Sequence, residues 1–265
     1  MIKLFVGCAP NGEDAESQMV LEYSARKHTS VPIDIVWMKI SNDPKSFWHG
    51  WNSIDWSTPF SGFRWGIPAY CKYKGQAIYM DSDMIIQRDL LDLWKQPLDP
   101  GTIALAKGGW RFCVTKFDNE AAKKHLMAID MLKANRMSHK MTCEFMQMNE
   151  KFLVTTFDPQ WNNYDGENNS LDQVKILHYT DMSTQPHIKY ALPRLAKAGI
   201  KHWYDGPIRT HRRKDVEELF DEYYNEAISN GYSVEQYEPS EVISYSKLSQ
   251  SNYSAHNGFD VTKGE

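Results

Sequence analysis

The sequence predicts an α/β protein with a mostly parallel central sheet flanked by helices. Short apolar runs rich in β-branched residues alternate with longer segments of helical periodicity through the first half of the chain. The length of 265 residues and the hydrophobic fraction of 42% suffice for one large domain with its own core. The chain has no internal repeat and no clear linker, so we expect a single domain with a helical C-terminal extension.

The elements of the first part follow from local composition. Residues 2–7 are apolar and end in glycine, which predicts a buried first strand. Turn and cap residues then precede a helical segment at 14–27, and the β-branched run 33–39 predicts a second strand. Aromatic and small residues at 59–73 have roughly helical spacing, which we expect to break near Pro68.

The middle of the chain continues this alternation. The apolar run 76–80 predicts a third strand, the leucine-rich segment 89–94 a short helix, and residues 102–106 a further strand. Apolar residues at helical spacing predict helices at 119–134 and 143–153.

The last part is mainly helical. Residues 174–178 predict a strand that ends in histidine, and helices are expected at 189–198 and 215–230. From Ser244 onward the sequence is rich in Ser and Asn without periodicity, so we expect a mobile tail.

Charge and cysteine usage narrow the functional classes. Lys plus Arg number 30 against 34 Asp plus Glu, a net charge of -4, which argues against a general nucleic-acid-binding protein. No apolar run reaches membrane-spanning length, and no signal-peptide pattern opens the sequence. The four cysteines form no CxxC pair and therefore suit a reducing interior. We expect a cytoplasmic protein without a transmembrane segment.

Two aspartates stand at the end of the third expected strand. In YMDSDMII, Asp81 and Asp83 are one residue apart between two apolar runs, where carboxylates are costly to bury without a partner. Two such acids can converge on one hard cation, and Mn²⁺ or Mg²⁺ also accept phosphate oxygens. In a reaction whose leaving group is a diphosphate, such a cation would neutralise the charge of that group as it departs. For the motif alone, capping of the following turn remains the alternative.

Several polar groups are expected at one edge of the sheet. In open α/β sheets, ligands bind beyond the carboxyl ends of the strands. Residues 7–10, Asp81 with Asp83, and His178 each lie at or just past the end of an expected strand. If those strands are neighbours, the three groups meet at one edge.

The order of motifs resembles a known family. The stretch 78–86, a strand leading into Asp-x-Asp and an apolar run, is similar to the central signature of A-type glycosyltransferases, and more specifically to the family of glycogenin and the bacterial lipopolysaccharide galactosyltransferases. Further matches follow in family order over about residues 2–189, by pattern rather than identity. They are Phe63-Arg64-Trp65 with Pro68, the segments EFMQMN at 144–149 and PQWN at 159–162, and HYTDMSTQPH at 178–187.

The resemblance implies a metal-dependent glycosyltransferase that uses a nucleotide-diphosphate sugar, a UDP-sugar by analogy, with retention of configuration. The acceptor, a carbohydrate, a lipid-linked sugar or a protein, is not identified. Residues 1–190 would form the donor-binding domain, 191–243 a helical extension packed on it, and 244–265 the tail. The chain departs from the family where Asp181 replaces a glycine and where the lysine expected near Gln185 is missing.

The resemblance also implies a set of site residues. The metal ligands for Mn²⁺ or Mg²⁺ would be Asp81, Asp83 and His178. The donor would be bound by Cys8, Ala9, Pro10, Asn11, Arg64, Ser82 and Gln185. The residues near the reacting sugar would be Glu144 and Gln160. Structural roles remain open for several of them: a tight turn for residues 8–11, a salt bridge for Arg64, and a solvated helix surface for Glu144.

Other functions compete with this interpretation. A phosphatase of the haloacid dehalogenase type also uses Asp-x-Asp, but after its first strand and with Thr or Val where this chain has Ile85. Sugar nucleotidyltransferases share the architecture but have a glycine-rich loop with arginine that GCAPNGEDAE lacks. A non-catalytic protein of the same fold that binds a nucleotide sugar or a carbohydrate stays open, given the missing lysine.

Overall fold

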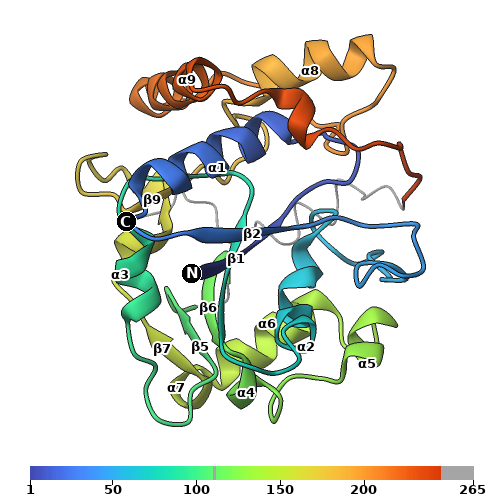
Figure 1. The fold of residues 1–265 in the computed structure, drawn as a ribbon, viewed down its shortest axis with the longest axis vertical. Coiled ribbons are helices and arrows are strands. Elements are labelled where there is room, and N and C mark those ends of the chain that lie inside the picture. The colour runs from blue at the N-terminus through green and yellow to red at the C-terminus, as the bar shows by residue number, and fades with distance from the viewer. Residues whose placement is uncertain (110–111, 246–265) are drawn as a thin grey trace.

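The computed structural model describes residues 1–109 and 112–245, and in that part of the chain a six-stranded sheet forms the centre (Figure 1). Its order is β2-β1-β3-β6-β5-β7. The strands are β1 (Ile2–Gly7), β2 (Ile33–Met38), β3 (Gln76–Asp81), β5 (Ala104–Ala106), β6 (Val114–Asp118) and β7 (Val154–Thr156). β2 and β3 pair with β1 in parallel and β7 with β5 in parallel, whereas β6 is antiparallel to both neighbours. The prediction of a mostly parallel sheet is confirmed.

A smaller sheet lies beside the first. It comprises β4 (Met84–Ile86), β8 (Asn163–Tyr164) and β9 (Ile176–His178) in the order β4-β9-β8. β9 is antiparallel to β4, with His178 opposite Met84. The expectation that three strand ends share one sheet edge holds for β1 and β3, but the strand that carries His178 belongs to this second sheet. Only Ser82 and Asp83 separate β3 from β4, so the Asp-x-Asp segment links the two sheets.

Helices cover both sides of the main sheet (Figure 1). The helices are α1 (Ala15–His28), α2 (Ile67–Tyr70), α3 (Leu90–Lys95), α4 (Asn119–Ala122), α5 (Ile129–Lys133), α6 (His139–Met148), α7 (Glu150–Leu153), α8 (Ile188–Lys197) and α9 (Lys214–Ser229). Short 3₁₀ helices are η1 (Ser61–Gly66), η2 (Pro159–Asn162), η3 (Asp165–Glu167) and η4 (Val234–Tyr237). α9 packs on α1 and the smaller sheet, with Val216 and Phe220 in one buried cluster with Val20 and Ile85. No helix in the described ranges has the length and apolar character needed to cross a membrane.

Some expected elements differ from those observed. The helix predicted at 119–134 is two short helices, because α4 begins at an Asp118 cap and ends at Ala122, and the exposed Lys123 and Lys124 follow it. β6 was not predicted because Lys116 interrupts its apolar pattern. Lys116 is buried in β6, and its ammonium group is satisfied by donating to backbone carbonyls, including that of Trp94 at 2.9 Å. Only Ser244 and Tyr245 of the expected tail lie within the described residues.

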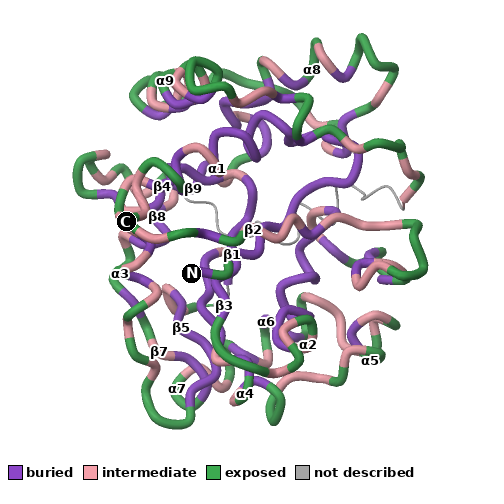
Figure 2. The backbone as a smooth tube through the Cα atoms, in the orientation of Figure 1, coloured by how far each residue is buried: buried purple, intermediate pink, exposed green. Residues whose placement is uncertain are grey.

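The core fixes the segments that lead to the strand ends. β1, β3 and the segment before α1 are buried almost throughout (Figure 2). η1 is held by edge-to-face packing of Phe63 against Trp51 and Trp56, with ring centroids 5.3 and 5.0 Å apart. Gly62 makes this possible because a Cβ atom at that position would overlap the Trp56 ring. The packing of η1 sets the position of Arg64, which points to the sheet edge.

Candidate functional site

The three predicted metal ligands lie close together where the Asp-x-Asp segment links the two sheets. The Nε2 atom of His178 lies 3.2 Å from Oδ1 of Asp83. Asp81 and His178 also offer ligand atoms within 4.8 Å of each other and of the Cys113 thiol. Cys113 was not predicted as a ligand. It lies close because of backbone pairing, in which the amide of Asp81 donates to the Cys113 carbonyl at 3.3 Å.

The contact between His178 and Asp83 has the character of a cation site. The Nδ1 atom of His178 lies 3.1 Å from Oδ1 of Asn162, an acceptor, so this nitrogen carries the ring proton of the neutral histidine. The Nε2 lone pair therefore faces Asp83 Oδ1, a buried oxygen to which no group in residues 1–109 and 112–245 donates. Two electron pairs that face each other in this way are stabilised by a bound cation.

Asp81 is held by Arg64. The guanidinium donates to Asp81 Oδ1 at 2.9 Å and to the carbonyls of Ser61 and Phe112 at 2.8 and 2.6 Å. It also lies 4.3 Å from the centre of the Tyr79 ring, and the Tyr79 hydroxyl donates to the same oxygen of Asp81. Burial alone would lower the pKa of Arg64, but the charge of Asp81 raises it above its ordinary value. Arg64 thus orients Asp81, although the resemblance assigned it to the donor phosphates.

Gln185 orients the other aspartate. Its side-chain amide donates to Asp83 Oδ2 at 2.6 Å and to the carbonyl of Tyr179 at 3.0 Å. Gln185 stands near the position where the resemblance places a lysine, so a neutral donor takes the place of a positive charge. The result is that Asp83 Oδ1 is directed toward His178.

Asp14 stands at the start of the helical segment predicted at 14–27, and its side chain lies beside the Asp-x-Asp link. Its carboxylate accepts from the Ser82 hydroxyl at 2.6 Å and from the Ala9 amide at 3.2 Å, and makes no cap to α1. Burial raises the pKa of Asp14 to about 7, and the hydrogen bond from Ser82 opposes this only in part. A carboxyl group in a cavity with a pKa near 7 is typical of a functional site.

Asp14→Asn is expected to stabilise the protein, and more at high pH. In the unfolded chain the carboxyl loses its proton near pH 3.8, but in the folded protein only near pH 7. The folded state therefore holds the proton longer, and stability falls as pH rises through this window. Removing the charge should raise the free energy of unfolding by up to about 4 kcal/mol at pH 8 and by less at pH 5. Urea unfolding at both pH values measures this. The exposed Asp34→Asn serves as control, and an equal effect of Asp14→Asn at both pH values would contradict the assignment.

The loop after β1, residues 8–11, is closed by the C-terminal side of the chain. All four residues are buried, and the Cys8 amide donates to the Met38 carbonyl at 3.2 Å. The side-chain amide of Asn11 donates to the Ile243 carbonyl at 3.0 Å and accepts from the Ile243 amide at 2.8 Å. Glu13 accepts from the Asn11 amide at 2.7 Å and from the Tyr245 hydroxyl at 2.6 Å. The segment that contains Ile243 and Tyr245 thus covers the loop formed by Cys8, Ala9, Pro10 and Asn11.

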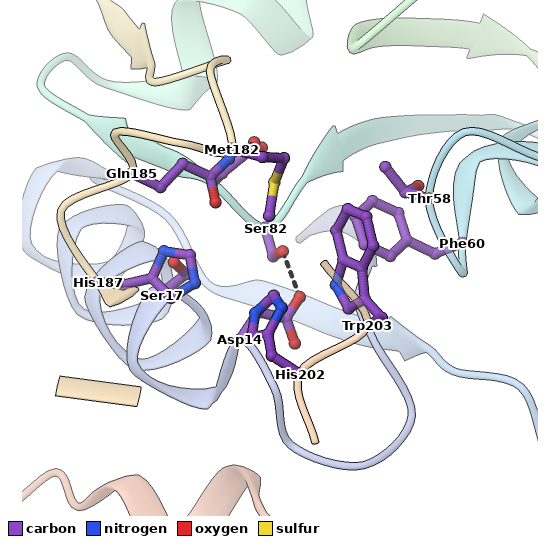
Figure 3. Close-up of a pocket in the computed structure, with 11 residues that line it drawn as sticks. Asp14, Ser17, Thr58, Phe60, Ser82, Met182, Gln185, His187, His202 and Trp203 are labelled. Atoms are coloured by element: carbon purple, nitrogen blue, oxygen red, sulfur yellow. Dashed lines mark hydrogen bonds between the residues drawn. The ribbon is translucent and has the colours of Figure 1, made fainter. Parts of the chain in front are cut away.

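A cavity that Asp83 helps to line opens beside the Asp-x-Asp link (Figure 3). Its walls come from the α1 side, the Asp-x-Asp link, the segment before η1 and the chain around α8. The lining residues are Asp14, Ser17, Thr58, Phe60, Ser82, Asp83, Met182, Gln185, His187, His202 and Trp203. His187 ends the motif at 178–187 but was not predicted as a site residue. His202 and Trp203 were not predicted because they lie in a segment without strand or helix periodicity.

Of the predicted site residues, Ser82, Asp83 and Gln185 line this cavity and the others do not. Glu144 is exposed on α6, 3.9 Å from Lys140, because Cys143 and Met146 occupy the buried side of the helix. Gln160 lies in η2, where its carbonyl accepts from the Lys175 amide at 3.0 Å. Neither lines the cavity. From that segment, Asn162 reaches the site instead through its contact with His178.

Comparison with known proteins finds similarity in structure. No protein-family model matches the sequence, and no curated protein matches it either. The galactosyltransferase LgtC, in complex with donor and acceptor sugar analogues, matches 85% of this chain over 96% of its own, with 12% identity and a TM-score of 0.54. The glycosyltransferase GlyE of Streptococcus pneumoniae TIGR4 matches 87% of this chain over 63% of its own, with 14% identity and a TM-score of 0.55.

The bifunctional glycosyltransferase WbbM matches 86% of this chain with 14% identity and a TM-score of 0.52. The chain spans half the length of WbbM and less than two thirds of GlyE. At these identities the likeness concerns the fold.

Proposed function

We propose that this chain, whose fold is that of the A-type glycosyltransferases, transfers a sugar from a nucleotide-diphosphate donor with the help of a bound Mn²⁺ or Mg²⁺ ion. The observation that carries the proposal is the pair of facing lone pairs on Asp83 Oδ1 and His178 Nε2, which lie 3.2 Å apart. Asp83 also lines the cavity. A carboxylate oxygen and a neutral imidazole suit such an ion.

Asp81, Asp83 and His178 would hold the ion. When bound, it would supply the positive charge that a departing diphosphate requires. The protein's own contribution is orientation: Arg64 fixes Asp81, Gln185 fixes Asp83, and Asn162 fixes the tautomer of His178. Cys113 lies in the same group, and because a thiolate favours softer ions, Zn²⁺ belongs in any metal titration.

The finer features of the reaction rest on the sequence resemblance. They are a UDP-sugar as donor, retention of configuration, and an acceptor that is a carbohydrate, a lipid-linked sugar or a protein. Glu144 and Gln160 stay proposals from the sequence alone. We place the reacting centre at the cavity, which neither of them lines.

A donor panel tests this function. Incubation with nucleotide sugars and Mn²⁺ is expected to release nucleoside diphosphate from one donor, because the ion neutralises the leaving group, and chelation by EDTA should stop the release. Nucleotide release is measured by chromatography, and boiled protein serves as the blank. Release at the same rate with EDTA would contradict metal dependence.

A second candidate is a non-catalytic protein of the same fold that binds a nucleotide sugar. The observation in its favour is Gln185, which puts a neutral amide where the resemblance expects a cation for the diphosphate. Tight, metal-dependent binding of a donor with no release, with or without candidate acceptors, would favour this candidate.

A further inference from the structure

Two histidines in the cavity have nitrogen atoms without partners. His187 is 1% exposed, and neither of its ring nitrogens has a hydrogen-bond partner among the described residues. His202 is 8% exposed, and its Nε2 atom likewise has none. The two ring centroids are 6.3 Å apart, and both residues line the cavity (Figure 3). Because a buried polar group without a partner is destabilising, these atoms call for a ligand.

The hydrogen-bonding capacity of the two rings can be assigned. Burial lowers the pKa of His187 well below its ordinary value, with help from His202 and Arg194, and burial lowers that of His202 to about 4. Both rings are therefore neutral at pH 7. The Nδ1 atom of His202 accepts from the Tyr204 amide at 3.0 Å, so its Nε2 carries the proton and is a donor. His187 adds one donor and one acceptor.

The rest of the cavity restricts the ligand. Asp14 and Asp83 line the same space, so an anionic group placed beside the two neutral rings would face carboxyl groups. Phe60 and Trp203 lie on the other side of Ser82 from His187 and present apolar aromatic surface (Figure 3).

We propose that His187 and His202 bind a vicinal diol of a sugar ring, with one hydroxyl accepting from a ring N–H and its neighbour donating to a ring nitrogen. The aromatic side chains of Phe60 and Trp203 pack against the ring. The diol belongs either to the ribose of a nucleotide or to a hexose. This inference rests on the proposed function, because the diol would belong to the sugar substrate that the same cavity holds. Its test measures binding and does not require turnover.

The experiment compares ligands with and without the diol. Isothermal titration uses UDP and 2′,3′-dideoxy-UDP, each with Mn²⁺, and thermal shift uses free glucose and galactose without metal. The main variant is His187→Leu, because this substitution removes only nitrogen atoms that have no partner within the described chain. His187→Gln restores a donor and an acceptor, His202→Phe provides a second variant, and the exposed His125→Leu is the matched control.

A ribose subsite predicts that wild type prefers UDP over the dideoxy analogue by about tenfold or more and that His187→Leu abolishes this preference. A hexose subsite predicts that free hexose raises the Tm of wild type and of His125→Leu, but not of His187→Leu or His202→Phe. In either case His187→Leu without ligand should have a Tm at or above that of wild type, since it relieves an unpaired buried group.

The inference is overturned if wild type and His187→Leu respond alike to both pairs of ligands. If wild type shows no metal-dependent binding of UDP but free hexose raises its Tm, and His187→Leu removes this rise, the proposed function is refuted and the diol subsite stands.

Discussion

Asp83→Ala is expected to abolish metal-dependent UDP binding and, with it, turnover. The substitution removes the oxygen that faces the His178 lone pair and leaves Gln185 without its acceptor, so one side of the ion site is lost. Removal of supporting groups alone weakens metal sites by about 10–100-fold, and loss of a ligand should exceed that. Isothermal titration of UDP in the presence of Mn²⁺ measures the effect.

The control for this variant is the same substitution at an exposed aspartate away from the site. Asp92→Ala, on the exposed side of α3, should bind UDP like wild type. Asp83→Ala should lose no more stability than the one hydrogen bond from Gln185 to Asp83 Oδ2 supplies, about 1.5–3 kcal/mol of unfolding free energy. An unchanged affinity for UDP with metal present would rule out Asp83 as a ligand.

Arg64→Met is expected to be the most destabilising substitution at the site. Arg64 and Asp81 form a buried pair, with side chains 5% and 10% exposed, and removal of one partner leaves the other charge uncompensated. Breaking such a pair costs about 3–5 kcal/mol of unfolding free energy. Urea unfolding at pH 7 measures the loss, and the double variant Arg64→Met with Asp81→Asn should recover much of it because no unpaired charge remains.

A surface pair gives the comparison for this prediction. Arg26 pairs with Glu22 at 2.8 Å, but its side chain is 42% exposed. Arg26→Met should therefore cost less than about 1 kcal/mol. If Arg64→Met costs no more than Arg26→Met, Arg64 does not stabilise Asp81 and its role in the site must be sought elsewhere.

The sequence predicts the site best where local pattern and sheet geometry agree. Asp81 and Asp83 follow an apolar strand, and the fold confirms that β1 and β3 are neighbours whose ends meet. The meeting of His178 with Asp83 depends on the short strand β4, which pairs with β9 in a separate sheet. Three residues of apolar sequence do not predict such a pairing, so the proximity was expected by resemblance and for a partly incorrect geometric reason.

Other parts of the site have no local signature. Cys113 approaches Asp81 because β6, with its buried lysine, inserts antiparallel between β3 and β5. His187 and His202 become neighbours only when the chain around α8 folds back over the cavity. Glu144 shows the converse, since a motif match placed it at the site while the helix turns it to solvent. Tertiary packing decides each of these positions, and helix or strand periodicity does not report it.

The contacts of Asn11 with Ile243 and of Glu13 with Tyr245 have a consequence for the order of biosynthesis. Each contact spans 232 residues of sequence, so the loop after the first strand receives its last partners only after translation has passed Tyr245. Until then the Glu13 carboxylate has the Asn11 amide as a donor but not the Tyr245 hydroxyl, and the loop stays uncovered while most of the sheet can already form. A nascent chain should therefore complete the loop after β1 in a late step, separate from the folding of its core.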